Sequence, residues 1–183
     1  MLYPTEYRLE IYGNDRSTKL GVLPMQFVSD GTFTKEVNGD YSMVINCYID
    51  LLEIPVMQYL INRNCIFLYE VNMPTGIPTV PKKFRIKKIS KIEESNGSIK
   101  VNIECEHITF DLIDEVIPVA TIYNGMTLGD LKTKIMSYTI NFSNGANSTL
   151  LDSYVIDTFT VGGRNILDQL KELTDKVKGW LVV

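Results

Sequence analysis

The sequence predicts an α+β protein: a β-barrel-like domain over residues 1–105 followed by a mixed α/β domain over residues 106–183. Three observations lead to this prediction. Apolar and polar residues alternate with the period of a β-strand through much of the first 105 residues. Near Glu106 the spacing of apolar residues changes to that of a helix. Two later segments, beginning near Thr127 and Asn165, combine a capping residue with an apolar stripe.

The first domain opens with two alternating runs. Tyr7, Leu9 and Ile11 alternate with polar neighbours until Gly13-Asn14-Asp15 ends the run, and a second run follows a turn at Asn38-Gly39. The apolar members of the second run are Tyr41, Met43, Ile45 and Cys47. Cys65–Val71 is a further strand. Residues 72–81 hold three prolines and a glycine and are predicted to be a loop, while 50–62 stays ambiguous because Pro55 breaks a long helix.

A hairpin closes the first domain. Asn96-Gly97 stands between two alternating runs, which is the strongest short-range hairpin signal because both turn residues need a positive φ. Ile99, Val101, Ile103 and Cys105 share one face of the second strand. In the first strand the apolar parity slips between Ile86 and Ile89. A β-bulge would explain the slip and would help a small sheet curl toward closure.

The second domain mixes helices and strands. A short amphipathic helix is predicted from the apolar residues Ile108, Leu112, Ile113, Val116 and Ile117. A second helix starts at the N-cap Thr127, with the stripe Leu128, Leu131, Ile135 and Met136. A polar loop (141–148), a strand (154–161) and a turn at Gly162-Gly163 precede a third helix, predicted over 166–178 with Asn165 as N-cap. A strand then begins at Trp180, which leads us to expect an N-terminal fragment of a longer polypeptide.

Composition narrows the function classes. The chain has 18 basic and 22 acidic residues, a net charge of −4, which is unlike a dedicated nucleic-acid-binding domain. The one basic cluster alternates with apolar residues and is predicted to be the solvated face of a strand; it comprises Lys82, Lys83, Arg85, Lys87, Lys88 and Lys91. Met1 is followed by LYPTEYRLE, so we expect no signal peptide, and the sequence has no apolar run of membrane-spanning length. No membrane partner is therefore expected.

The metal-ligand and redox residues are few. Cys47, Cys65 and Cys105 lie far apart in predicted strands, so we expect them to be reduced and buried. No CxxC spacing occurs and the single histidine, His107, has no second histidine to share a metal. The sequence therefore predicts no metal site and no cofactor.

Three constellations could carry chemistry, and each has a structural interpretation that we favour. His107 is the one candidate general base, and Cys105 lies on the same strand face, but Cys105 continues an apolar stripe. The possible paired carboxylates are predicted to be solvated; they are Glu93, Glu94, Asp111, Asp114 and Glu115. Gly162-Gly163 lacks the spacing of a phosphate loop and is predicted to be a turn. No catalytic, cofactor-binding or metal-binding residue is predicted.

Three stretches carry a family resemblance. FRIKKISK (84–91), followed by a hairpin and CEHITFDLID (105–114), resembles the signature region of the phage and prophage tail-hub family, often labelled prophage tail protein or tail endopeptidase. The stretch from Phe33 to Tyr48 resembles an early strand of that family. Arg164–Val183 resembles its later helix-then-strand segment.

The resemblance implies a structural protein of the virion tail, made in the bacterial host cytoplasm. It implies a baseplate hub, related to the spike hub of type VI secretion, that joins the distal end of the tail tube to a spike or tail lysin. Two barrels per subunit would let a homotrimer of the full-length form match a hexameric tube, with DNA passing through the lumen without specific binding. Peptidase activity in this family is implied for C-terminal extensions, so no enzyme is expected here.

Two alternatives remain open. One is a cell-wall-directed hydrolase, an endopeptidase with Cys105 or His107 at its centre. The other is a carbohydrate-binding tail-tip module, which would need an exposed aromatic platform. The only tryptophan, Trp180, lies among apolar neighbours, and no such platform is evident from the sequence.

Overall fold

The computed structural model describes residues 5–36, 41–72, 75–93, 98–140, 142 and 150–177. The chain divides into two compact units, Met1–Ile108 and Thr109–Val183, where the sequence suggested a division between Cys105 and Glu106. Four sequence predictions fall wholly or largely outside the described residues: the turns at Asn38-Gly39 and Asn96-Gly97, the loop at 141–148 and the strand beginning at Trp180.

The first unit is built on one antiparallel sheet with the strand order β2-β1-β5-β7-β8-β4-β3, and β6 pairs with β5 beside this path. Its strands are β1 Thr5–Tyr12, β2 Lys19–Leu23, β3 Val28–Lys35, β4 Tyr41–Asp50, β5 Cys65–Asn72, β6 Ile77–Pro78, β7 Lys82–Glu93 and β8 Ser98–His107. Two 3₁₀ helices, η1 Met25–Phe27 and η2 Leu51–Tyr59, complete the unit.

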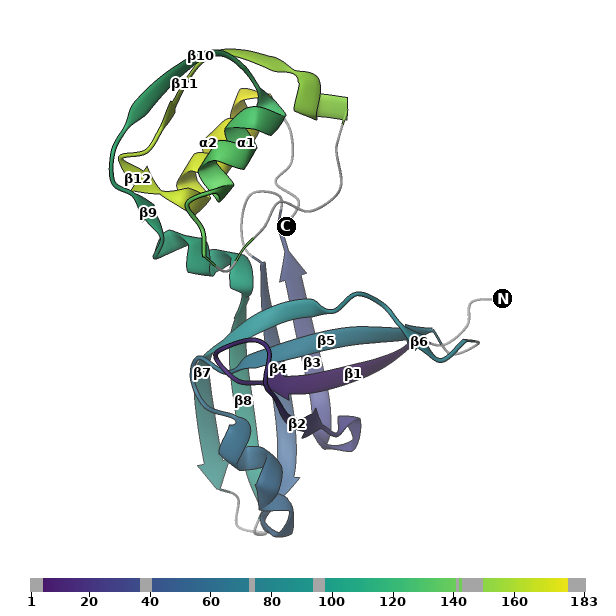
Figure 1. The fold of residues 1–183 in the computed structure, drawn as a ribbon. Helices are drawn as coiled ribbons and strands as arrows, with labels where there is room; N and C mark the ends of the chain where they lie inside the picture. Colours follow the sequence, from purple (N-terminus) through teal and green to yellow (C-terminus); the bar gives the residue numbers. More distant parts are fainter. Residues whose placement is uncertain are drawn as a thin grey trace. The chain divides into compact units, whose positions relative to one another are not determined.

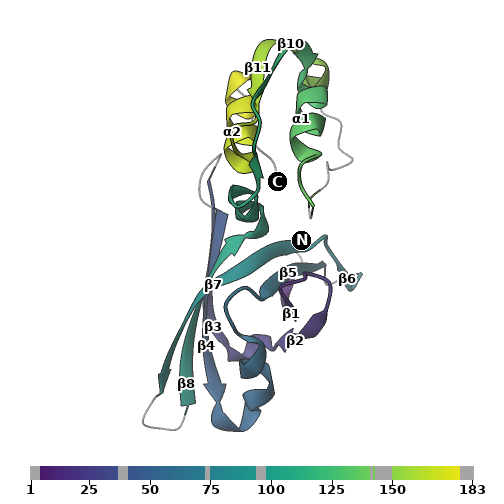
Figure 2. The same cartoon turned by 60° about the vertical axis from the view of Figure 1, so that its left-hand side comes forward.

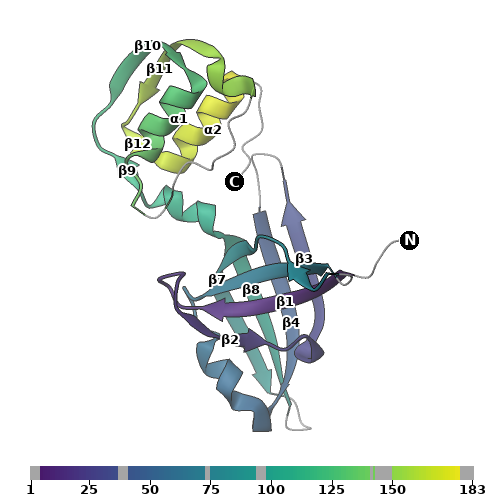
Figure 3. The ribbon, with the colours of Figure 1, turned by 45° about the vertical axis from the view of Figure 1, so that its right-hand side comes forward.

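The sheet curls into a half-barrel. The part formed by β1, β2 and β5 runs across the part formed by β3, β4 and β8 (Figures 1 and 3). The helix η1 contacts both β1 and β4, and η2 contacts both β2 and β4, so residues near the two ends of the sheet meet around these helices. The inner face carries the core, which includes Leu9, Ile11, Met43, Ile45, Cys47, Phe84, Ile86, Val101, Ile103 and Cys105.

The curling has the origin that the sequence predicted. The pairing of β7 with β8 shifts register between Ile86 and Lys88, which confirms the predicted bulge. One extra residue on β7 increases the local twist and lets the sheet bend. The alternating pattern is confirmed as well, because Val101, Ile103 and Cys105 are buried while their polar neighbours in β8 are only partly covered.

Two predictions for the first unit need correction or completion. The proline-rich segment is not wholly a loop, because Ile77 and Pro78 pair with Asn72 and Val71. A pair this short at a sheet edge tolerates proline, and the N–H of Thr79 donates to the carbonyl of Glu70 at 2.8 Å. The ambiguous segment after β4 is η2, a 3₁₀ helix that contains Pro55.

The second unit packs two helices with two short antiparallel ribbons. Its elements are β9 Val116–Ile117, β10 Thr121–Thr127, α1 Leu128–Met136, η4 Leu150–Ser153, β11 Val155–Val161, β12 Arg164–Asn165 and α2 Ile166–Lys176. β10 pairs with β11 and β9 with β12. The helices α1 and α2 lie side by side (Figure 3), and both contact the β10–β11 ribbon, which is seen next to α2 in Figure 2. The core gathers Leu112, Ile117, Leu131, Ile135, Ile156, Phe159, Val161, Ile166, Leu167, Leu170 and Leu173.

Both helix starts are confirmed. The side chain of Thr127 accepts a hydrogen bond from the N–H of Asp130 at 3.1 Å, and the side chain of Asn165 accepts one from the N–H of Asp168 at 2.8 Å. The helix predicted after Glu106 is shorter than expected. It is the 3₁₀ helix η3, Ile108–Ile113, and Val116–Ile117 form strand β9 instead. Pro118 explains the change, since a residue before proline avoids the helical region.

Candidate functional site

The end of β8 holds the one candidate general base. His107 is buried, and its ring stacks on Tyr41 of β4 with centroids 4.1 Å apart and planes 12° apart. Phe84 of β7 meets the His107 ring edge-on at 5.5 Å, and Phe33 of β3 meets both Phe84 and Tyr41 edge-on. Lys35 and Lys82 lie over the rings of Tyr41 and Phe33. We call Phe33, Tyr41, Phe84 and His107 the aromatic cluster.

The surroundings of His107 and Cys105 hold both side chains uncharged. Burial lowers the pKa of His107 to about 4, and the nearby charge of Lys35 adds to this effect. Burial also raises the pKa of the Cys105 thiol far above its usual range. A buried neutral thiol is a poor nucleophile, so this arrangement supports packing rather than attack on a substrate.

The candidate carboxylates differ in how far they are exposed to solvent. Asp111 is only 6% exposed, so the prediction that it lies on a solvated helix face is wrong. That prediction assumed 3.6 residues per turn, whereas η3 is a 3₁₀ helix with a repeat of three. Asp114 is exposed and Glu115 is half-buried. Glu94 and the side chain of Glu93 lie outside the described part of the chain.

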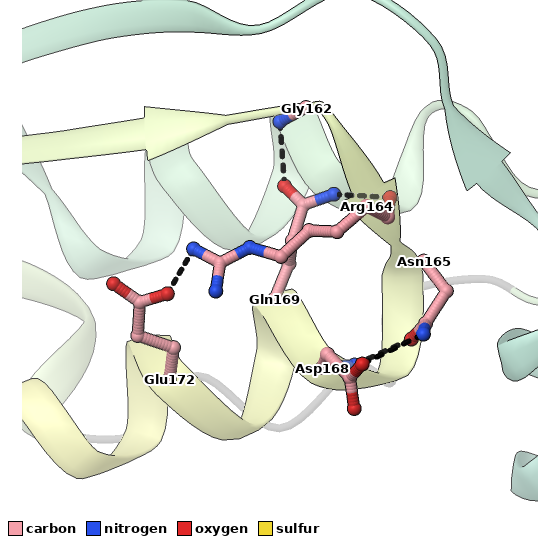
Figure 4. A network of polar contacts seen from close by, with 6 residues as sticks. All are labelled: Gly162, Arg164, Asn165, Asp168, Gln169 and Glu172. Carbon is pink, nitrogen blue, oxygen red and sulfur yellow. Dashed lines mark hydrogen bonds and ion pairs between the residues drawn. The ribbon is translucent and has the colours of Figure 1, made fainter.

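The Gly162-Gly163 turn is occupied by the protein's own groups (Figure 4). The buried side chain of Gln169 accepts a hydrogen bond from the N–H of Gly162 at 2.8 Å and donates one to the carbonyl of Arg164 at 3.1 Å. Asn165 and Asp168 cap the start of α2, and Arg164 pairs with Glu172. Because a carboxylate already lies at this helix start, the turn does not offer an anion site.

The basic strand is largely neutralised by neighbouring strands. Lys88 pairs with Glu104 at 3.2 Å and Lys87 with Glu106 at 3.0 Å, both across the β7–β8 ladder. Lys82 pairs with Glu70 of β5, and Lys83 lies over the ring of Phe67. A phosphate-binding stripe would leave its cations available, so these contacts support the predicted solvated strand face.

Sequence reasoning missed a buried charge on the outer face of β1. Glu10 is 4% exposed, and its carboxylate accepts hydrogen bonds from Lys19 Nζ at 2.6 Å and Tyr12 Oη at 3.0 Å, with Arg8 Nε at 3.1 Å. Burial would raise the pKa of Glu10, but the hydrogen bonds and the two cations outweigh it and hold that pKa below its usual value. The ring of Tyr12 stacks on the ring of Phe67, with centroids 4.1 Å apart. A polar residue on an alternating strand gives no sequence signal of such burial.

The described residues contain neither a metal-ligand group nor a membrane-spanning helix. No three His, Cys, Asp or Glu residues in the described ranges are grouped as metal ligands. None of the helices described is long and apolar enough to cross a bilayer. The three cysteines are buried and unbridged, as the sequence predicted.

Comparison with solved structures identifies the architecture. The prophage tail protein gp18 of Listeria monocytogenes superposes with a TM-score of 0.55 at 13% identity, over 92% of this chain and 45% of that chain. The 43 kDa tail protein of prophage MuSo2 from Shewanella oneidensis gives 0.54 at 9% identity, over 92% and 49%. The chain shares the fold of these prophage tail proteins.

A chain of a further solved complex has the same fold. A chain of the Francisella PdpA–VgrG complex, in its half-lidded form, superposes with a TM-score of 0.51 at 13% identity, over 94% of this chain and 28% of that chain. The present chain spans less than half the length of either prophage tail protein. No protein-family model matches the sequence, and no curated protein matches it at the sequence level.

Proposed function

We propose that this chain is part of a structural tail protein that serves as a baseplate hub between the distal end of a tail tube and a spike or tail lysin. The observation that carries the proposal is the shared fold with two prophage tail proteins over 92% of the chain. In this proposal the first unit is the tube domain, the second belongs to the hub body, and the protein resides in the virion tail.

The side-chain chemistry supports a mechanical role. The candidate nucleophile and base are neutral and buried, and the polar network around Gln169 satisfies backbone groups of its own chain's turn. Lys87 and Lys88 are paired with glutamates. Paired cations attract phosphate groups less, which supports the proposal that DNA passes through the lumen without specific binding.

The proposed partners follow from the hub role. Full-length subunits form a homotrimer that meets the tail tube or a distal tail protein on one side and the spike or lysin on the other. Two tube-like barrels per subunit would present six similar surfaces to a hexameric tube ring.

The test uses the full-length product and assembled tails. Light scattering at several concentrations is expected to give a stable trimer, and gold-labelled antibody against this chain is expected to decorate the distal tip of the tail tube. A full-length protein that stays monomeric at high concentration, or label found along the tube or on the capsid, would contradict the hub assignment.

A further inference from the structure

The two ends of the half-barrel sheet differ in how they are covered. At the β2 end, Tyr59 of η2 lies against Gly21, where an added Cβ would stand 3.4 Å from the Tyr59 ring. At the other end, β3 pairs with β4 and, within the described ranges, with no other strand. Residues 29–33 of β3 are all exposed, and the side chain of Phe33 is 40% exposed. The outer edge of β3 therefore presents backbone donors and acceptors for another strand.

The usual protections of a sheet edge are weak along β3. No proline interrupts it, and its register shift lies at its beginning, between Val28 and Asp30. Its two charged side chains turn onto their own sheet. Asp30 accepts a hydrogen bond from Asn46 at 2.7 Å, and Lys35 lies 5.2 Å from the ring centroid of Tyr41. Because both side chains contact their own sheet, neither charge lies at the outer edge of β3, where it would oppose the approach of another strand.

The sequence of β3 is complementary to itself. If two copies pair antiparallel with Thr32 opposite Thr32, then Phe33 lies opposite Gly31 and Thr34 opposite Asp30. Phe33 and Gly31 both belong to the inner face, since they pair with the buried residues Met43 and Ile45. An added Cβ on Gly31 would meet only the carbonyl of Val44, at 3.7 Å, so a ring opposite it has room. An aromatic side chain facing an edge glycine is a favourable cross-strand pair.

We propose that β3 of one copy of this chain pairs with β3 of a second copy in that register, forming a symmetric dimer with a continuous sheet. Pairing would cover the unpaired edge of β3 and so prevent other chains from adding to it and aggregating before the hub assembles. The proposal goes beyond the hub role, because it concerns the free chain, and ring formation would have to replace this contact. One strand pair buries less than the roughly 1,200 Å² of a stable interface, so the dimer is weak and concentration-dependent.

Single-cysteine variants test the register. Thr32→Cys is expected to give a disulfide-linked dimer under mild oxidation, because directly opposite residues are about 4.5–5.5 Å apart at Cα. Thr34→Cys is the matched control on the same strand face, and it faces Asp30 instead of itself. The native cysteines do not interfere, since all three are buried. Failure of Thr32→Cys to link, or equal linking by Thr34→Cys, would overturn the proposal.

Light scattering supplies a measurement without engineered thiols. The 183-residue chain is expected to shift from monomer to dimer as its concentration rises. Thr32→Lys places two ammonium groups opposite each other and should weaken the dimer several-fold, because like charges directly opposite are destabilising. Thr158→Lys, on an exposed position of β11, is the control that should dimerise as the wild type does.

Equal dimerisation by the Thr32→Lys variant would overturn the β3 pairing. The trimer of the full-length protein is a separate measurement, so loss of the hub proposal and loss of this proposal are told apart.

Discussion

His107 shows how a single residue couples this fold to pH. It is the only histidine in the chain, and it stacks within the aromatic cluster of the first unit. Its pKa of about 4 in the folded state lies below the ordinary value of 6.5. The unfolded chain therefore binds more protons than the folded chain between these two values, and stability falls as pH drops from 6.5 toward 4.

We expect the free energy of unfolding to decrease by about 2 kcal/mol between pH 7 and pH 5, from a total linkage of about 3 kcal/mol. Urea denaturation at closely spaced pH values measures it. The His107→Gln variant is the control, and its stability should change far less over this range because the titrating group is gone. A wild-type chain as stable at pH 5 as at pH 7 would contradict the burial of this histidine.

The cysteines give a second prediction at this scale. Burial raises the pKa of the Cys47 thiol to about 12, and Cys65 and Cys105 are also buried. A thiol reagent at pH 8 should label the folded chain very slowly and should count three thiols once urea unfolds it. Rapid labelling without denaturant would place at least one cysteine at the surface, and a count of one would reveal a disulfide.

Alternation predicted which residues point inward but not which polar residues are buried. Cys105 and His107 share the inner face of β8, as the period of two requires. Glu10 and Asp111 escaped prediction for different reasons. The burial of Glu10 depends on Tyr12 and on Lys19 from the next strand, and that of Asp111 on the type of helix that forms. Such contacts depend on tertiary structure, which periodicity does not encode.

At the scale of elements, the Gly162-Gly163 turn is the most constrained connection described. Gly162 has φ +109°, and a Cβ placed on it would stand 2.0 Å from the carbonyl oxygen of Val119. Gly163 has φ +75°, but a Cβ placed on it would stand 3.6 Å from its nearest neighbour, the Cβ of Ala120. Gly162 thus needs both its conformation and its missing side chain, whereas Gly163 needs only its conformation.

The two glycines therefore form a matched pair. Gly162→Ala should destabilise the chain by about 3 kcal/mol or more through backbone displacement, and Gly163→Ala by about 1–2 kcal/mol through φ strain alone. Thermal or urea denaturation of both variants measures the difference. Equal losses, or a smaller loss at Gly162, would mean that the segment before β10 does not pack on this turn.

Elements with local signals were predictable, and elements without them were not. Thr127 and Asn165 marked the starts of α1 and α2 because a capping side chain acts on a backbone N–H three residues away. The strand β3 was not identified, since VSDGTFTK has no clear alternation and gains its strand conformation by pairing with β4. β2, β10 and the two-residue strands likewise depend on partners elsewhere in the chain.

At the scale of the whole molecule, the α+β class was predictable because strand and helix patterns occupy different parts of the chain. The prediction that the sheet curls depended on one break in the alternation of apolar residues in β7, and the structure has a bulge there. Three short stretches of the sequence already resembled a family of phage tail proteins, although the solved structures that share the fold are only 9–13% identical to this chain. Packing fixes the apolar positions while leaving their identities free.

One prediction concerns activity of the chain as a whole. Purified chain should not release fragments from peptidoglycan or cleave casein, because its only histidine and the cysteine beside it are buried and neutral. Dye-release and casein assays measure this directly. Turnover that the His107→Ala variant abolishes, while the variant still folds, would establish a hydrolase instead.

The strand order also governs how the chain folds during synthesis. β1 is translated first, but one of its partners is β5, and Thr5 can pair with Asn72 only after β5 has been synthesised. In the same way, Ser42 of β4 can pair with Glu106 only after β8 has been synthesised. Only strands that are consecutive in the sequence and adjacent in the sheet, such as β1–β2, β3–β4 and β7–β8, can pair as they leave the ribosome. The high contact order of the remaining pairs makes closure of the first unit slow, on the scale of about milliseconds to seconds. Until β8 emerges, β4 lacks one of its two partners, and the nascent chain is then at its most vulnerable to misassembly on a polysome.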